Sequence, residues 1–176
     1  MLNVSICQDK NPKDNSLRSQ SLTLLAKVLA HFVPHLSSKQ TDEVIDTLWM
    51  LSESNEDFVS SLLPRCFGHI SSVCDPSTLE TKVLQKLDKK LEEAVNDPTL
   101  DYGLYNSMLL EILSSCNGSS VEENRVKDFV RVQFTILNMK VDTDSDDEEA
   151  VERTFNLIAA ALRILAKLIE QCPHGT

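Results

Sequence analysis

Residues 41–75 read TDEVIDTLWMLSESNEDFVSSLLPRCFGHISSVCD, and this stretch decides the expected fold. Apolar side chains recur at helical spacing over residues 44–51 and again over residues 58–70, which is the pattern of two amphipathic helices. The polar step Ser54-Asn55 separates the two stripes. Two helices joined by so short a turn form a helical hairpin, the building unit of helical-repeat proteins.

Local signals predict where these two helices begin and where one of them bends. Thr41 is the expected N-cap of the first helix, because its side-chain oxygen can accept a hydrogen bond from an otherwise unpaired backbone N–H. Asn55 is the expected N-cap of the second helix for the same reason. Pro64 falls inside the second apolar stripe and removes one helical hydrogen bond, so we expect a kink or a break near Leu63.

The rest of the chain continues the helical pattern. Further apolar stripes, separated by proline, asparagine and glycine turns, predict helices at residues 17–33, 79–95, 100–115, 121–139 and 150–172. The valine-rich middle of the 121–139 segment is compatible with a strand, but the length of the segment favours a helix. The expected fold class is therefore all-α, with about seven helices.

We divide the single expected domain into four parts. Residues 1–16 are polar and predict a flexible N-terminal arm, and residues 17–139 form the expected helical-repeat region. Residues 140–149 predict an acidic flexible loop that precedes a C-terminal packing or capping helix at residues 150–172. This last helix is apolar on more than half of its circumference, so it is either central in the fold or covered by something outside this chain.

Charge and composition disfavour several classes of protein. A net charge of −10 over 176 residues argues against a nucleic-acid surface, which needs clustered lysine and arginine. No segment reaches the ~20 apolar residues that cross a bilayer, so we expect no membrane partner. The 5 cysteines form no CxxC pair and the chain opens with no secretory signal, which predicts reduced thiols and a cytoplasmic or nuclear location.

No constellation of side chains predicts catalysis, so we expect no enzyme activity, no cofactor and no metal. Cys66, His69 and Cys74 are close in sequence but lack the spacing and the fourth ligand of a zinc site. An EF-hand loop beginning at Asp142 would lack its required glycine and its final glutamate. Ser145 is followed directly by acidic residues, which resembles the acidic consensus of casein kinase 2, and it is a candidate phosphosite.

One part of the chain resembles a known family. The run TLWMLS at residues 47–52, followed by NEDFV at residues 55–59, resembles the armadillo repeat, in which a Leu-Trp-x-Leu-Ser end of the second helix precedes a short turn and an apolar third helix. The resemblance is best over residues 22–75, while HEAT-type repeats fit residues 78–139 about as well. It implies a right-handed α-solenoid segment.

The same resemblance points to two candidate partner-binding residues. In importin-alpha-like members, the tryptophan and an asparagine four residues later line a groove for basic peptides. Here Trp49 is followed at that position by Glu53, so the pattern is kept at one position and changed to an acidic residue at the other. The resemblance implies that Trp49 and Glu53 contact a basic peptide, whereas the apolar periodicity by itself favours a core position for Trp49.

These observations predict a protein-interaction scaffold or adaptor of armadillo/HEAT-like repeats, which binds a basic or amphipathic peptide or helix of a partner protein. The alternative is a compact helical bundle that serves as a regulatory or assembly subunit of a larger complex. A compact fold of this length has a radius of gyration of about 16 Å, and a solenoid exceeds that value. An enzyme with an unrecognised site is the third and weakest interpretation, and the oligomeric state is left open.

Overall fold

The fold is entirely helical over the part of the chain that can be described. The computed structural model describes residues 20–21, 24–29, 31–53, 57–97, 100, 102–116, 123–139 and 148–171. Every regular element within these ranges is a helix and none is a strand, which confirms the predicted all-α class. The predicted arm at residues 1–16 and most of the predicted acidic loop at residues 140–149 lie outside these ranges.

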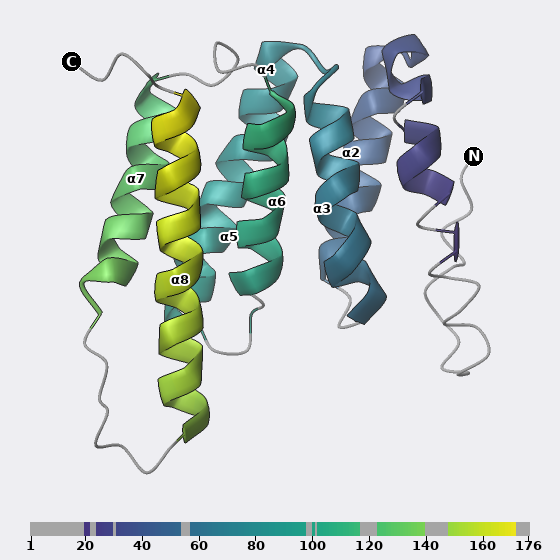
Figure 1. Cartoon of the computed structure of the whole chain (residues 1–176). Coiled ribbons are helices and arrows are strands. Elements are labelled where there is room, and N and C mark those ends of the chain that lie inside the picture. The colour runs from purple at the N-terminus through teal and green to yellow at the C-terminus, as the bar shows by residue number, and fades with distance from the viewer. Residues whose placement is uncertain are drawn as a thin grey trace.

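The helices follow one another with short connections (Figure 1). Helical backbone at residues 20–21, 24–29 and 31–32, which we call the N-terminal helix, leads into η2. The elements after it are η2 (Val33–His35), α2 (Ser38–Ser52), α3 (Asp57–Ser71), α4 (Pro76–Thr78), η3 (Leu79–Leu84), α5 (Gln85–Asn96), α6 (Tyr102–Ser115), α7 (Glu123–Leu137) and α8 (Glu148–Gln171). The π-helical turn η3 joins α4 to α5, so residues 76–96 form one continuous helical run.

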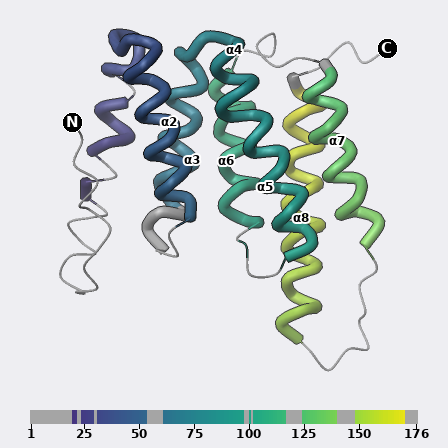
Figure 2. The backbone as a smooth tube through the Cα atoms, turned by 180° about the vertical axis from the view of Figure 1, so that it is seen from behind, coloured from purple at the N-terminus to yellow at the C-terminus, as the bar shows by residue number. Residues whose placement is uncertain are grey.

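The longer helices pack as hairpins in two rows. The pairs α2–α3, α5–α6 and α7–α8 are in contact within each hairpin. Between hairpins, α3 packs on α6 and α6 on α8 in one row, while α2 contacts η3 and α5 contacts α7 in the other. The two opposite views show this side-by-side order, with the N-terminal helix at one end and α7 and α8 at the other (Figures 1 and 2).

A single hydrophobic core holds the rows together. Its buried side chains run from Ala26 in the N-terminal helix to Leu168 in α8. The largest fully buried members are Trp49, Phe67 and Phe129, which come from α2, α3 and α7. With so few aromatic residues in the chain, most of the remaining core is leucine, isoleucine and valine, as the composition predicts.

The start of α2 differs from the prediction. Ser37, and not Thr41, is the N-cap: its Oγ accepts a hydrogen bond from the Gln40 backbone N–H at 3.4 Å, and the Ser37 backbone N–H donates to Gln40 Oε1 at 3.0 Å. This reciprocal pair is a capping box, which satisfies two end groups of the helix at once. Thr41 is instead buried inside the helix. The proposed cap Asn55 lies outside the described residues.

Of the kink or break expected near Leu63, the break is absent. α3 continues through Pro64 to Ser71, although the proline cannot donate the usual backbone hydrogen bond. Leu63, Cys66 and Phe67 around it are fully buried. Tertiary packing of this apolar face stabilises the helix more than the missing hydrogen bond destabilises it. The valine-rich segment of α7 is helical, as its length predicts.

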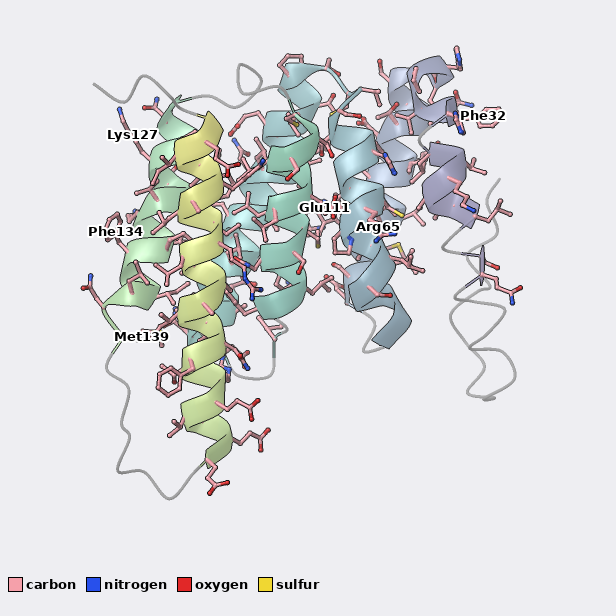
Figure 3. All side chains as sticks on the ribbon, viewed as in Figure 1. Phe32, Arg65, Glu111, Lys127, Phe134 and Met139 are labelled. Atoms are coloured by element: carbon pink, nitrogen blue, oxygen red, sulfur yellow. The ribbon has the colours of Figure 1, made fainter. Side chains whose placement is uncertain are left out.

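Helices α3 and α6 approach closely at Gly68. A Cβ atom built on Gly68 would lie 2.8 Å from Ser115 Oγ and 3.2 Å from the backbone oxygen of Glu111. Glu111 and Arg65 mark this seam on α6 and α3 (Figure 3). The absence of a side chain at position 68 therefore sets the distance between the two helices.

Gly68→Ala is expected to lower the free energy of unfolding by about 1 to 3 kcal/mol, because the added methyl group must push the helices apart. Urea unfolding monitored by circular dichroism measures this loss. Gly103→Ala, at an exposed position of α6, is the matched control and should raise stability by about 0.5 to 1 kcal/mol through helix propensity. Equal stabilisation by both changes would contradict the close contact.

Candidate protein-interaction surfaces

Trp49 lies in the core, where it joins three helical elements. Its indole Nε1–H donates a hydrogen bond to the backbone oxygen of Lys82 in η3 at 3.0 Å. Its ring packs in a tilted arrangement on Phe67 of α3, with centroids 4.8 Å apart. The Lys86 Nζ lies 4.9 Å from the centroid of the ring, within the range of a cation–π interaction.

This burial bears on the residues expected to contact a partner. Only 2% of Trp49 is exposed, so the indole offers almost no surface to another molecule in this structure. Glu53 is exposed and forms the C-cap of α2. The structure thus does not bring Trp49 and Glu53 together on an open surface, and we place the candidate surfaces elsewhere. The candidate phosphosite Ser145 lies outside the described residues.

A partly buried ionic cluster around Arg125 ties α7 to η3 and α5. Arg125 bonds Glu80 through its Nε at 3.1 Å and through its Nη2, and its Nη1 bonds Asp88 at 3.0 Å and Asp128 at 3.3 Å. The Arg125 side chain is only 13% exposed. Glu80 Oε2 and Asp88 Oδ1 are buried and have no hydrogen-bond partner in the described part of the chain. No local sequence pattern predicts this cluster, because Arg125 lies 45 residues from Glu80 and 37 residues from Asp88 along the chain.

The electrostatics of the cluster follow from burial and from the shared guanidinium. Burial raises the pKa of Asp88, although the charge of Arg125 acts in the opposite direction. The hydrogen bonds to Glu80 raise the pKa of Arg125, which keeps the guanidinium charged. One cation facing three carboxylates is suited to fixing the packing of α7 on α5.

The described cysteines are thiols with little reactivity. Burial raises the pKa of Cys66 to about 12 and the pKa of Cys74 to about 11, and it also raises the pKa of Cys116. A thiol with so high a pKa is almost fully protonated at neutral pH and is a poor nucleophile. Among the described residues, no group of three or more His, Cys, Asp or Glu side chains is arranged to hold a metal ion.

An open pocket of about 400 Å³ lies between the start of α6 and the first half of α8. Tyr102, Glu149, Glu152 and Arg153 contribute to its lining. Two of these groups are engaged in the fold: the Tyr102 hydroxyl donates to Gln133 Oε1 at 3.1 Å, and Arg153 Nη2 donates to the backbone oxygen of Ala94 at 3.2 Å. Burial raises the pKa of Tyr102, so its hydroxyl stays protonated. Tyr102 and Arg153 are therefore held by contacts within the fold.

Helix α8 carries two apolar stripes instead of one. The inner stripe is buried against the neighbouring helices and consists of Leu157, Ala161, Ile164 and Leu168. The outer stripe consists of Phe155, Leu162 and Ile169, which recur every seven residues and so lie on one face of the helix. Half-buried Ile158 and Leu165 lie between the two stripes on the helical wheel and connect them.

The outer stripe of α8 is open to solvent at one end of the array. Phe155 is 53% exposed, Leu162 is 54% exposed and Ile169 is 72% exposed. Phe134 of α7 is also 53% exposed and points away from the other helices (Figure 3). We call Phe134, Phe155, Leu162 and Ile169 the C-terminal end surface. Scattered exposed apolar residues are ordinary, but four large ones on the two helices at one end of an array are typical of an interaction surface.

The N-terminal helix presents a second apolar stripe at the opposite end. Leu24 is 62% exposed, Val28 is 39% exposed and Phe32 is 59% exposed. Their four-residue spacing places them on one face, while Ala26 and Leu29 of the same helix are buried. Phe32 points outward at the far end from Phe134 (Figure 3). We call Leu24, Val28 and Phe32 the N-terminal end surface.

The two end surfaces differ in the charge at their edges. The exposed carboxylates of Glu148, Glu149 and Glu152 lie in the first turns of α8, next to Phe155 in sequence. Lys27 and His31 are exposed on the N-terminal helix, and residues 20–39 contain no acidic residue. The C-terminal end surface therefore has carboxylates at its start, with the cation Arg163 exposed next to Leu162 further along α8, and the N-terminal end surface has the cation Lys27.

Comparison with known proteins adds no family to this description. No protein-family model matches the chain, and searches of curated proteins and of solved structures found no match. In the described ranges, no helix combines the length and the apolar character needed to cross a bilayer.

Proposed function

We propose that the protein is an interaction scaffold, an armadillo/HEAT-like right-handed α-solenoid segment that binds an amphipathic helix of a partner protein. The hairpins packed in two rows support a solenoid, because each hairpin contacts mainly its neighbours along the row. The partner helix would lie along α8 on the C-terminal end surface.

The observation that carries this proposal is the exposed outer stripe of α8. Its three members repeat every seven residues, the spacing at which one helix packs along another. From Phe155 to Ile169 the stripe is about 21 Å long, enough for about four turns of a partner helix. An apolar stripe of this kind on the last helix of an array needs a cover in water, because the outer helices of a free-standing array carry polar outer faces.

The charge at the edge of this surface favours a basic partner helix. Glu148 is exposed seven residues before Phe155, in line with the stripe, Glu149 and Glu152 are exposed in the same first turns of α8, and the whole chain carries a net charge of −10. Lysine or arginine on the flank of the partner helix would be attracted by these carboxylates, which raises the rate of association and selects against acidic helices. Such attraction is screened by salt.

A designed helical peptide tests this proposal. The probe carries leucine at heptad a and d positions and lysine at the flanking positions, and a matched peptide carries glutamate in place of lysine. Fluorescence anisotropy should show that the lysine peptide binds at least about tenfold more tightly than the glutamate peptide at low salt.

Two protein variants locate the binding. Leu162→Glu, at an exposed position, should weaken binding of the lysine peptide by at least about tenfold, since it places a charge inside the apolar contact. Met50→Glu on α2, where the side chain is 61% exposed outside both end surfaces, should leave binding unchanged. Equal binding by the wild type and Leu162→Glu would reject the C-terminal end surface as the site.

A further inference from the structure

We propose that the protein also binds a second copy of itself, with the N-terminal end surface of one copy on the C-terminal end surface of the next. This inference rests on the proposed function, because it uses the same C-terminal end surface and names an occupant for it. The two surfaces lie at opposite ends of one array, as the positions of Phe32 and Phe134 show (Figure 3). Each surface is an exposed apolar stripe on a terminal helix.

Charge complementarity favours a second copy over an unrelated apolar partner. The exposed cation Lys27 accompanies the stripe of the N-terminal helix, with no carboxylate in residues 20–39. The exposed carboxylates of Glu148, Glu149 and Glu152 accompany the outer stripe of α8. Contact of unlike ends therefore joins apolar to apolar and basic to acidic, whereas two C-terminal ends would bring the carboxylates of both copies together.

The packing inside one copy provides the geometry for this contact. Within the chain, the flank of each hairpin packs on the flank of the next, as α3 packs on α6 and α6 on α8. A second copy whose N-terminal helix lies against α8 would continue the rows in the same way. The contact uses different surfaces on the two copies, so it is heterologous and leaves one end of each kind free for further growth. Short linear chains of copies are the expected product.

Two complementary variants test the contact by analytical ultracentrifugation. Val28→Glu/Phe32→Glu disables the N-terminal end surface, and Leu162→Glu/Ile169→Glu disables the C-terminal one; all four side chains are exposed in the single copy. The average mass of the wild type should rise with concentration beyond that of a dimer. Each variant alone should stay monomeric at concentrations where the wild type associates, with association at least about tenfold weaker.

Mixing the two variants is the decisive step. Each retains one working surface, so an equimolar mixture should form a single 1:1 dimer that grows no further. Lys27→Glu, a mild surface change, should weaken wild-type association, and Met50→Glu should leave it unchanged. Circular dichroism confirms that every variant is folded.

The inference is overturned if the wild type stays monomeric up to about 1 mM, if either double variant still associates with itself, or if the mixture stays monomeric. These outcomes are separate from failure of the proposed function. A monomeric wild type that binds the lysine peptide through Leu162 rejects self-association alone. Loss of peptide selectivity together with an unaffected Leu162→Glu variant rejects the proposed docking function itself.

Discussion

Trp49→Ala is expected to lower the free energy of unfolding by about 3 to 5 kcal/mol, as large aromatic side chains do when they are removed from a core. The indole packs on Phe67 and donates a hydrogen bond to the backbone oxygen of Lys82, so its removal leaves a cavity and loses this hydrogen bond. Chemical unfolding followed by far-ultraviolet circular dichroism measures the loss.

Two further variants separate the parts of this effect. Met50→Ala changes the adjacent residue, which is 61% exposed, and should alter stability by less than about 0.5 kcal/mol. Trp49→Phe retains an aromatic ring but loses the hydrogen bond to Lys82. Its free energy of unfolding should therefore lie between that of the wild type and that of Trp49→Ala. A loss below about 1 kcal/mol for Trp49→Ala would place the side chain on the surface and reopen its role in partner binding.

Arg125→Ala should destabilise the fold by about 3 to 5 kcal/mol, since it leaves Glu80 and Asp88 partly buried beside Asp128 without their cation. The same chemical unfolding experiment measures this change. Arg131→Ala is the matched control, because its ion pair with Glu92 is exposed and should contribute less than about 1 kcal/mol. Arg125→Lys keeps the charge but loses the planar fork, so it should recover only part of the stability.

The effect of Arg125→Ala should also depend on pH. Burial raises the pKa of Asp88 above its ordinary value of 3.8, so the folded protein binds more protons there than the unfolded chain does. The stabilisation contributed by protonated Asp88 is therefore greatest below pH 3.8. It is lost as the pH rises through the pKa that Asp88 has in the folded protein. Removing Arg125 removes the positive charge that lowers the pKa of Asp88. The pH range over which the protonated Asp88 stabilises the fold therefore becomes wider.

The stability loss caused by Arg125→Ala should thus shrink as the pH falls from neutral toward the ordinary pKa of a carboxyl group. Adding Asp88→Asn to Arg125→Ala should reduce both the loss of stability at neutral pH and the dependence of that loss on pH. The asparagine amide carries no charge that would be left buried without a cation. A loss that is the same at every pH would mean that Arg125 stabilises the fold through packing and not through its charge on the three carboxylates.

The proposed function depends on surfaces, whereas these two predictions concern the interior. Core residues such as Trp49 hold the hairpins in register, and the Arg125 cluster fixes α7 on α5. The hairpin α7–α8 then presents the outer stripe of α8 in a fixed orientation. A destabilised variant would weaken docking indirectly, so peptide binding is best compared among variants of exposed residues.

Sequence periodicity alone predicted much of this fold. The spacing of apolar residues placed the helices from α2 to α8, usually within two residues of their observed ends, because helical backbone bonds and helix faces depend on residues only four apart. The same spacing showed that the last helix is apolar over more than half of its circumference. It did not identify Ser37 as the cap of α2, and of the kink or break expected near Leu63 the break is absent.

Tertiary structure decided which apolar faces are buried and which charges meet. The hydrogen bond from Trp49 joins it to Lys82, 33 residues later, and Arg125 meets Glu80 across 45 residues. Contacts at such separations arise from the packing of whole hairpins, and no local pattern encodes them. Packing likewise buries Leu157, Ile164 and Leu168 and leaves Leu162 and Ile169 open, although all five belong to one apolar helix. The sequence thus determined the helices, and their arrangement determined the surfaces on which the proposed function rests.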